Sequence, residues 1–260
     1  MLIDTHCHIH EANYPLDIGD VMQRAHHEGI AKMICVGTNE QSSREAVAFA
    51  AQHDYVSAAL GVHPHDTKDG YEELADILAA DASSVVAIGE IGLDYFYTHS
   101  PREVQIAALE AQIELALAHD LPIIFHVRDA SSAEQRQSVW NDFWPIVDSY
   151  GSKIRGVLHS FTDSQDNMEA AIARRLYIGV NGISTFTKDE KQKEMFAAIP
   201  LDKLLLETDA PFLTPTPFRG KVNEPAFVRQ VAEHHARIRG LSLDEIATQT
   251  SANAHALFAL

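Results

Sequence analysis

The sequence predicts an α/β fold, a (β/α)8 TIM barrel that forms a single domain over residues 1–260 and ends in a helical extension. Short apolar runs alternate with helical patterns along the whole chain, and there are eight such runs. The length of 260 residues also matches the ~250 residues typical of this barrel. Strict alternation indicates parallel strands with right-handed crossovers, and eight units favour a closed barrel over an open doubly wound sheet.

The predicted strands are rich in Val, Ile and Leu and bounded by Gly, Pro or charged residues, as expected when both faces are buried. They cover residues 2–6, 32–37, 56–61, 85–89, 122–126, 154–159, 176–180 and 203–207. Amphipathic helical patterns cover residues 42–53, 71–80, 102–119, 139–150, 165–174, 189–198 and 226–239. Residues 241–260 form the predicted helical extension, with Ser242 as its N-cap.

Composition limits the class of protein. Hydrophobic residues at 46% and charged residues at 22% are ordinary for a globular protein. No apolar run approaches the ~20 residues needed to span a bilayer, and the N-terminus shows no secretory signal. We therefore expect a cytoplasmic protein, a monomer or weak oligomer, without a membrane partner. Cys7 and Cys35 are predicted to be buried and reduced.

The net charge of −17 argues against a broad basic surface for duplex nucleic acid. It leaves open a phosphate substrate held by metal ions in a local cleft. The chain has neither a G-x-G-x-x-G motif nor a Walker A loop, so no nucleotide cofactor is predicted.

Six potential metal ligands lie at or just after the ends of predicted strands: His6, His8, Glu90, His126, His159 and Asp209. The carboxyl ends of parallel barrel strands meet at one end of the barrel, so these side chains are expected to converge. Taken singly, each has an ordinary explanation as a hydrogen-bonded core histidine or a buried salt bridge. Together they favour a metal site, because buried imidazoles and carboxylates need bonded or charged partners.

Four imidazoles and two carboxylates suit one or two divalent ions, namely Zn²⁺, Mn²⁺, Mg²⁺ or Co²⁺, although histidine disfavours Mg²⁺ alone. Two such ions carry more charge than the carboxylates, so the site is positive on an acidic protein. Metal-activated water and two ions are suited to phosphoryl displacement. Glu90 is the predicted bridge between the ions. Asp209 is the predicted residue that holds one ion and orients or deprotonates the water.

Residues near the predicted strand ends and in the last loop are expected to contact the substrate: His63, His65, Arg128, Arg219 and Lys221. Arginine suits bidentate phosphate binding. A solvated charge or a loop hydrogen bond is the alternative for each of them, and it weighs most for His65, Arg219 and Lys221. Residues 210–221 are either a linker or a lip over the barrel mouth.

Three loop aromatics, Tyr95, Phe96 and Phe212, could stack on bases, although packing is the commoner role for such residues. Asp4 and Glu207 share the inward parity of the ligands and are candidate partners of them.

Several motifs together resemble the signatures of the TatD-type metal-dependent deoxyribonucleases, within the amidohydrolase-like barrels. They are DTHCH at 4–8, GVHPH at 61–65, IGEIGLD at 88–94, HVRDA at 126–130, ETDAP at 207–211 and RGKVNEP at 219–225. The resemblance spans nearly the whole chain. It implies a barrel that hydrolyses DNA phosphodiesters, commonly as a 3′→5′ exonuclease on single strands.

The resemblance also implies a division of the ligands. His6, His8, Glu90 and Asp209 would hold one metal ion, and Glu90, His126 and His159 the other. The segment 158–164, LHSFTDS, departs from the family pattern, in which a cysteine commonly follows the histidine and a glycine lies near the position of Asp163.

Two alternatives remain open. The first is another ester or amide hydrolase on the same barrel, such as a deaminase, a cyclic-amide hydrolase, a phosphotriesterase-like lactonase or a D-aminoacyl-tRNA deacylase. Several of these place a carboxylated lysine where this chain has Glu90, which favours the TatD group. The second is a metal-storage or scaffold barrel, which would not need His63, Arg128 and Asp209 beside the metals.

Overall fold

The computed structural model describes residues 1–97, 99–130 and 138–260. Within these ranges eight parallel strands form one sheet in sequential order. The strands are β1 Leu2–Cys7, β2 Ile30–Val36, β3 Val56–Leu60, β4 Val85–Asp94, β5 Ile123–Arg128, β6 Gly156–Leu158, β7 Tyr177–Val180 and β8 Leu204–Leu206. An isolated bridge between Cys7 and Ala210 brings the last strand back to the first. The predicted TIM barrel is therefore confirmed.

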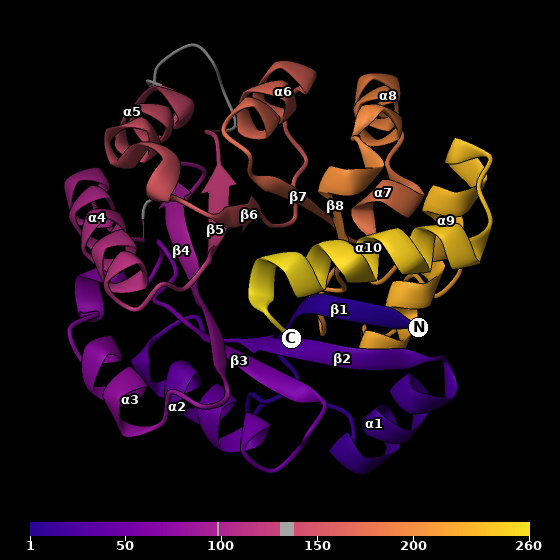
Figure 1. The fold of residues 1–260 in the computed structure, drawn as a ribbon, viewed down its shortest axis with the longest axis horizontal. Coiled ribbons are helices and arrows are strands. Elements are labelled where there is room, and N and C mark those ends of the chain that lie inside the picture. The colour runs from indigo at the N-terminus through magenta and orange to yellow at the C-terminus, as the bar shows by residue number, and fades with distance from the viewer. Residues whose placement is uncertain (98, 131–137) are drawn as a thin grey trace.

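Helices cover the outside of the strands on all sides (Figure 1). They are α1 Ile18–His27, α2 Glu40–Ala50, α3 Leu74–Ala80, α4 Arg102–Ala118, α5 Trp140–Tyr150, α6 Gln165–Ala173, α7 Ile183–Phe186, α8 Glu190–Ala198, α9 Val228–Arg239 and α10 Leu243–Phe258. Short 3-10 turns lie at Thr67–Asp69, Gly151–Lys153, Leu201–Lys203 and Pro225–Phe227.

Two of these helices, α1 and α7, were not predicted. In α1 only Val21, Met22 and Ala25 are buried, so the apolar stripe is too narrow to stand out from a polar segment. Its clearest local signal is the N-cap, because the Asp17 side chain accepts a hydrogen bond from Asp20 N. The four-residue α7 is too short for a periodic pattern.

The extension α10 closes the end of the barrel where the strands begin. Its residues Leu257 and Phe258 pack against inward-facing strand residues such as Ile3 and Leu205. Asn253 Nδ2 also donates to the carbonyls of Leu201 and Leu204, both at 2.8 Å. Figure 1 shows α10 beside β1, with both chain ends next to it. The other end of the barrel is thereby left for the functional side chains.

The predicted N-cap of α10 is confirmed. The Ser242 side chain accepts from Glu245 N, and the Glu245 side chain accepts from Ser242 N, which forms a capping box. The cysteines are buried free thiols, as predicted, and their Sγ atoms lie 4.0 Å apart in a thiol–thiol hydrogen bond between neighbouring strands. None of the helices in the described ranges is both long and apolar enough to cross a bilayer.

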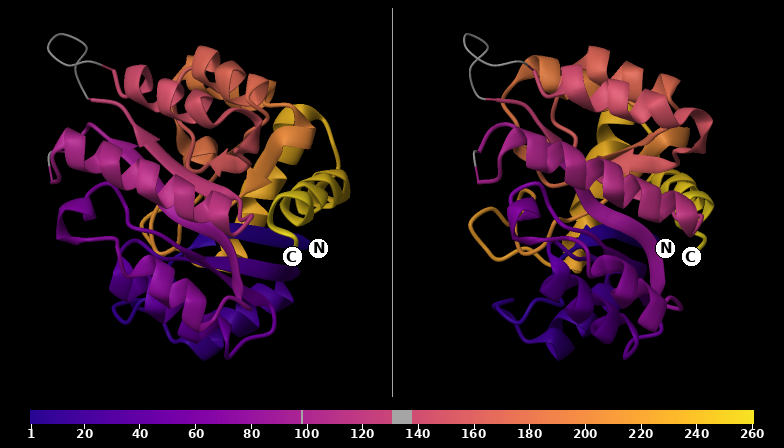
Figure 2. Two further views of the ribbon diagram at one scale, coloured as in Figure 1. Left: turned by 60° about the vertical axis from the view of Figure 1, so that its left-hand side comes forward. Right: turned by 90° about the vertical axis from the view of Figure 1, so that its left-hand side faces the viewer.

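The loop between β8 and α9 projects from the end of the barrel opposite α10 and the chain ends (Figure 2, right). Its first part is a lip, because Phe212 and Leu213 line the cavity at the barrel mouth. Its later part folds against the side of the barrel. There Phe218 stacks on Phe227 with ring centroids 4.4 Å apart. Residues 210–221 are thus a lip over the barrel mouth in their first part and a linker to α9 in their later part.

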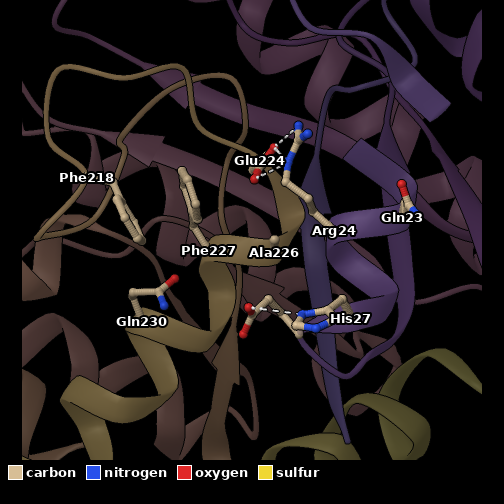
Figure 3. A pocket seen from close by; sticks show the side chains of 9 residues that line it. Gln23, Arg24, His27, Phe218, Glu224, Ala226, Phe227 and Gln230 are labelled. Carbon is tan, nitrogen blue, oxygen red and sulfur yellow. Dashed lines mark hydrogen bonds and ion pairs between the residues drawn. The ribbon is translucent and has the colours of Figure 1, made fainter. Parts of the chain in front are cut away.

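Contacts with α1 fix the end of this loop. Arg24 Nε lies 2.8 Å from Glu224 Oε2 in an ion pair whose carboxylate is buried (Figure 3). This pair and the stacked phenylalanines border a cavity of about 290 Å³ on the flank of the barrel. The loop is therefore held at its end while its first residues face the barrel mouth.

Candidate metal centre

The six predicted ligands come together at the carboxyl ends of the strands. Glu90 Oε1 lies 2.7 Å from His159 Nε2 and 2.8 Å from His126 Nδ1. Glu90 Oε2 lies 3.4 Å from His6 Nε2. The side chains come from β1, β4 and β5 and from the residues just after β1, β6 and β8. Glu90 is the carboxylate common to both sides of the cluster.

A second contact set lies on the β1 side of Glu90. His6 Nε2 and His8 Nε2 are 3.1 Å apart, and Asp209 Oδ1 is 3.3 Å from His8 Nε2. His8 Nδ1 lies 2.8 Å from the carbonyl oxygen of Val36. Because a carbonyl oxygen only accepts, Nδ1 of His8 carries a proton, which leaves Nε2 as the nitrogen that would bind an ion.

The strand β4 is longer than predicted, and this corrects the position of Glu90. The predicted strand ended at residue 89, whereas β4 runs to Asp94 with a register shift between Ile88 and Ile91. Glu90 is therefore inside the strand and buried. Gly92 allows β5 to approach closely, since a Cβ there would lie 1.8 Å from the His126 carbonyl oxygen. Glu90 and the flanking glycines had indicated a strand end. In the structure, Glu90 supplies a carboxylate to the site, and Gly92 lets β5 pack close to β4.

Carboxylates behind the ligands hold them in place. Asp94 Oδ2 lies 3.0 Å from His126 Nε2, and Glu207 Oε1 lies 3.5 Å from His159 Nδ1. Asp4 instead accepts from Thr208 N and Oγ1 at 2.8 and 2.6 Å, which ties β1 to the segment after β8. Asp94 was not predicted as a site residue, although it shares the parity of Glu90 along β4.

The electrostatics indicate a site built to hold positive charge. Burial alone raises the pKa of Glu90, but the neighbouring imidazoles, His159 foremost, hold this pKa well below its usual range. Burial lowers the pKa of His8, yet its bond to Asp209 prevails and raises the pKa to about 9. Although burial also lowers the pKa of His159, Glu90 raises it well above the ordinary value. Protons on the histidines thus balance the carboxylates, and divalent ions would replace those protons.

The donor set fits divalent metal ions. Ligand atoms of His6, His8 and Glu90 lie within 4.8 Å of one another, as do those of His63, Glu90 and His126. His6 Nδ1 is buried without a hydrogen-bond partner, and burial lowers the pKa of this histidine, which favours the neutral ring that binds metal. Imidazole nitrogens and carboxylate oxygens suit Zn²⁺, Mn²⁺ and Co²⁺, and Mg²⁺ less well.

The residues predicted to contact substrate occupy different places. His63, His65 and Arg128 line a cavity of about 760 Å³ that also holds the metal-site cluster. His63 Nε2 lies only 3.6 Å from Glu90 Oε1, so His63 lies within the cluster of candidate metal ligands. His65 Nε2 lies 3.0 Å from Asp94 Oδ2, but without hydrogen-bond geometry. The guanidinium of Arg128 covers the Phe96 ring at 3.9 Å.

Arg219 and Lys221 lie further along the loop, and neither is among the described residues that line this cavity. Arg219 Nη1 donates to the Thr214 carbonyl at 2.8 Å, and its guanidinium lies 3.8 Å from the centre of the Phe186 ring. Lys221 Nζ lies 5.1 Å from the Phe218 ring centroid.

The unusual segment 158–164 is fixed by its own side chains. Ser160 N donates to Glu207 Oε1 at 2.6 Å, and Asn181 Nδ2 donates to Ser160 Oγ at 2.8 Å. Asp163 Oδ2 accepts from Trp140 Nε1 at 3.0 Å. Asp163 therefore connects this loop to α5, in addition to its bonds within the loop. It is not among the described residues that line the cavity.

An eight-stranded parallel barrel with imidazoles and carboxylates gathered at its carboxyl end defines a metal-dependent hydrolase of the TIM-barrel class. The family described as TatD related DNase matches residues 3–259, and the chain belongs to this family.

Individual relatives are similar to this chain over nearly their whole lengths. The chain is 40% identical to the uncharacterized metal-dependent hydrolase YabD of Bacillus subtilis, with 99% of each chain covered. It is 36% identical to the 3′-5′ ssDNA/RNA exonuclease TatD of Erwinia amylovora, with 100% of each covered. The crystal structure of YJJV, a TATD homolog from Escherichia coli, superposes with a TM-score of 0.89 at 30% identity, over 100% of this chain and 98% of that one.

Proposed function

We propose that this protein is a two-metal deoxyribonuclease that hydrolyses phosphodiester bonds of single-stranded DNA, acting in the 3′→5′ direction. The observation that carries the proposal is the position of Glu90. One of its oxygens contacts His126 and His159, and the other faces His6. A carboxylate shared by two sets of ligand atoms is suited to bridge two ions.

The residues divide accordingly. His6, His8, Asp209 and Glu90 would hold one ion, and Glu90, His126 and His159 the other. Bound divalent ions of this kind lower the pKa of water toward about 7 and stabilise charge on phosphoryl oxygens.

Asp209 is the proposed proton acceptor. It lines the cavity, and although burial raises its pKa, the bond to His8 and the nearby imidazoles hold that pKa below its usual value. The carboxylate is thus ionised and able to take the proton of the attacking water. His63 is kept neutral, because burial holds its pKa well below the ordinary value, and it can hydrogen-bond to a phosphoryl oxygen.

Arg128 is the proposed phosphate-binding cation. It lines the cavity and lies above the Phe96 ring, which fixes the position of the guanidinium. Because the protein carries a net charge of −17, attraction of DNA must come from the site itself and not from the wider surface. The activity named for the Erwinia relative supports single strands as the substrate.

The test compares metal-loaded wild type with His126→Ala and Asp209→Ala on one substrate panel. The panel holds free-ended single-stranded DNA, the same strand with a blocked 3′ end, RNA and a D-aminoacyl-tRNA. We expect shortening of the free-ended strand, loss of shortening with EDTA, and loss in both folded variants. Cleavage confined to the aminoacyl ester would overturn the nuclease proposal and favour a deacylase on the same site.

A further inference from the structure

Two exposed aromatic rings line the cavity that holds the metal-site cluster. Tyr97 is 42% exposed and Phe212 is 59% exposed. Among the described residues, the other large hydrophobic side chains of comparable exposure are Met1, Tyr55 and Ile238, and none of these lines the cavity. A single exposed ring is unremarkable in a soluble protein, but two rings in one polar cavity indicate a ligand with apolar faces.

The rings lie on opposite sides of the barrel mouth. Tyr97 follows β4 and Phe212 follows β8. The strands run in the order β1 to β8 around the barrel, so β4 and β8 are half a turn apart. The metal-site cluster has Glu90 on β4 and Asp209 just after β8, and its other ligands lie on or just after β1, β5 and β6. The two rings therefore flank the cluster.

The backbone of each ring residue is tied to the metal centre. Tyr97 N donates to Asp94 Oδ1 at 3.2 Å, and the other oxygen of Asp94 contacts His126. Phe212 N donates to the carbonyl oxygen of Asp209 at 2.9 Å. These bonds fix the backbone of both residues relative to the ligands before any substrate arrives. A ring on a fixed backbone has only its own side-chain torsions left to order on binding, which favours its use as a contact surface.

Neighbouring aromatics are occupied in other ways. Tyr95 is buried, and its hydroxyl donates to Asp142 Oδ2 at 2.7 Å. Phe96 lies beneath the Arg128 guanidinium at 3.9 Å. The same guanidinium lies 5.3 Å from the Tyr97 ring centroid, so a cation stands beside this exposed ring. An exposed ring with an adjacent cation matches a nucleotide, which has an aromatic base and a phosphate.

We infer that Tyr97 and Phe212 are base-stacking subsites, which hold the bases of the two nucleotides on either side of the scissile phosphate. The inference rests on the proposed phosphodiesterase function and deepens it. Two neighbouring bases must part to reach opposite walls, which an unpaired strand permits and a duplex resists. Stacking is also sequence-tolerant, because every base has a π-face. The two rings thus select unpaired strands without selecting a sequence.

The test uses single-stranded oligonucleotides in which either the 3′-terminal or the penultimate nucleotide carries a tetrahydrofuran in place of its base. The proteins are wild type, Tyr97→Ala, Phe212→Ala and the conservative variants Tyr97→Phe and Phe212→Tyr. Tyr55→Ala is the matched control, since Tyr55 is 37% exposed and lies outside the cavity wall. Each variant is checked for metal content and unfolding temperature.

For wild type, removal of either base is expected to raise KM about 5- to 150-fold, the range that corresponds to the stacking of one base. On the intact strand, each alanine variant should show a similar rise in KM. Removal of the base at one position should then have no further effect on the KM of that variant, and this position should differ between the two variants. Tyr97→Phe, Phe212→Tyr and Tyr55→Ala should behave like wild type.

The inference would be overturned if wild type cleaves all three substrates with the same KM, or if both alanine variants keep their sensitivity to both missing bases. Absence of cleavage of every oligonucleotide by metal-loaded wild type would instead remove the proposed nuclease function, and the subsites with it. The two failures are therefore distinguishable.

Discussion

Asp94 Oδ2 lies 3.0 Å from His126 Nε2, on the side of the imidazole that faces away from Glu90. The other ring nitrogen, Nδ1, lies 2.8 Å from Glu90 Oε1. Burial raises the pKa of Asp94, but the hydrogen bond from His126 and the nearby imidazole of His65 outweigh it and keep the carboxyl ionised. An ionised carboxylate only accepts, so Nε2 donates to Asp94, and Nδ1 is the nitrogen that would bind an ion in place of its proton.

Replacement of Asp94 by asparagine should weaken metal binding by about 10- to 100-fold, because the amide no longer fixes the His126 tautomer. Titration of the metal-free protein with Mn²⁺ measures this loss. Asp66→Asn is the matched control, since Asp66 lines the same cavity and its bond to His63 is made by the backbone N–H and not by the carboxylate. Equal affinities for wild type and Asp94→Asn would show that Asp94 does not position His126.

Metal binding should strengthen as pH rises from about 6 to about 9. Without metal, Asp209 raises the pKa of His8 to about 9 despite burial, and Asp94 and Glu90 raise the pKa of His126. His8 therefore carries a second proton at neutral pH, and the raised pKa of His126 favours protonation of that ring as well, so the ions must displace these protons. Calorimetric titrations in buffers of different ionisation enthalpy report the protons released. An affinity that does not change with pH would contradict this account.

His235 should make the folded protein less stable in mild acid. It is buried in α9, and burial holds its pKa well below the ordinary value. The folded protein thus keeps a neutral ring, while the unfolded chain binds a proton below about pH 6.5. The free energy of unfolding should therefore fall as pH drops through 6.5, by up to about 1.4 kcal/mol per pH unit.

Urea unfolding of His235→Gln at several pH values measures this contribution, since glutamine can still bond to Ser184 but does not titrate. The variant should lose less stability than wild type between about pH 6.5 and about pH 5. His27→Gln is the control, because the His27 side chain is 86% exposed. Parallel pH profiles for wild type and His235→Gln would refute the assignment.

Leu257→Ala should lower the free energy of unfolding by about 2–5 kcal/mol, because the side chain is buried where α10 closes the barrel. The number of ions bound should stay the same, since the metal centre lies at the opposite end. Chemical unfolding and metal analysis of one preparation test both statements. A variant that loses bound metal while keeping its stability would contradict the proposed separation of the two ends.

Local sequence patterns were sufficient to predict the barrel and to predict that its six candidate ligands lie close together. The apolar runs are buried on both faces, so their positions are visible in the sequence, and parallel strands place their ends together. The pattern failed at β4, where a buried glutamate and two glycines resembled a strand end. Only the packing of Gly92 against the His126 carbonyl explains why the strand continues.

Side-chain directions in the loops were beyond prediction, because they depend on contacts between distant segments. Arg219 and Lys221 were expected near the substrate, yet neither is among the described residues that line the cavity. The arginine points to Phe186, a residue of the unpredicted α7. Tyr97 was overlooked beside Tyr95 and Phe96, since only the structure distinguishes the exposed ring from the two packed ones.

The central claim is a pair of ions bridged by Glu90. It is tested most directly by titrating metal-free protein with Mn²⁺ while following the shortening of a 5′-labelled single strand. We predict that cleavage rises steeply only as the second equivalent of Mn²⁺ binds, and that Glu90→Gln binds fewer ions and does not cleave. Full activity with one equivalent bound, or an active Glu90→Gln variant, would contradict the account.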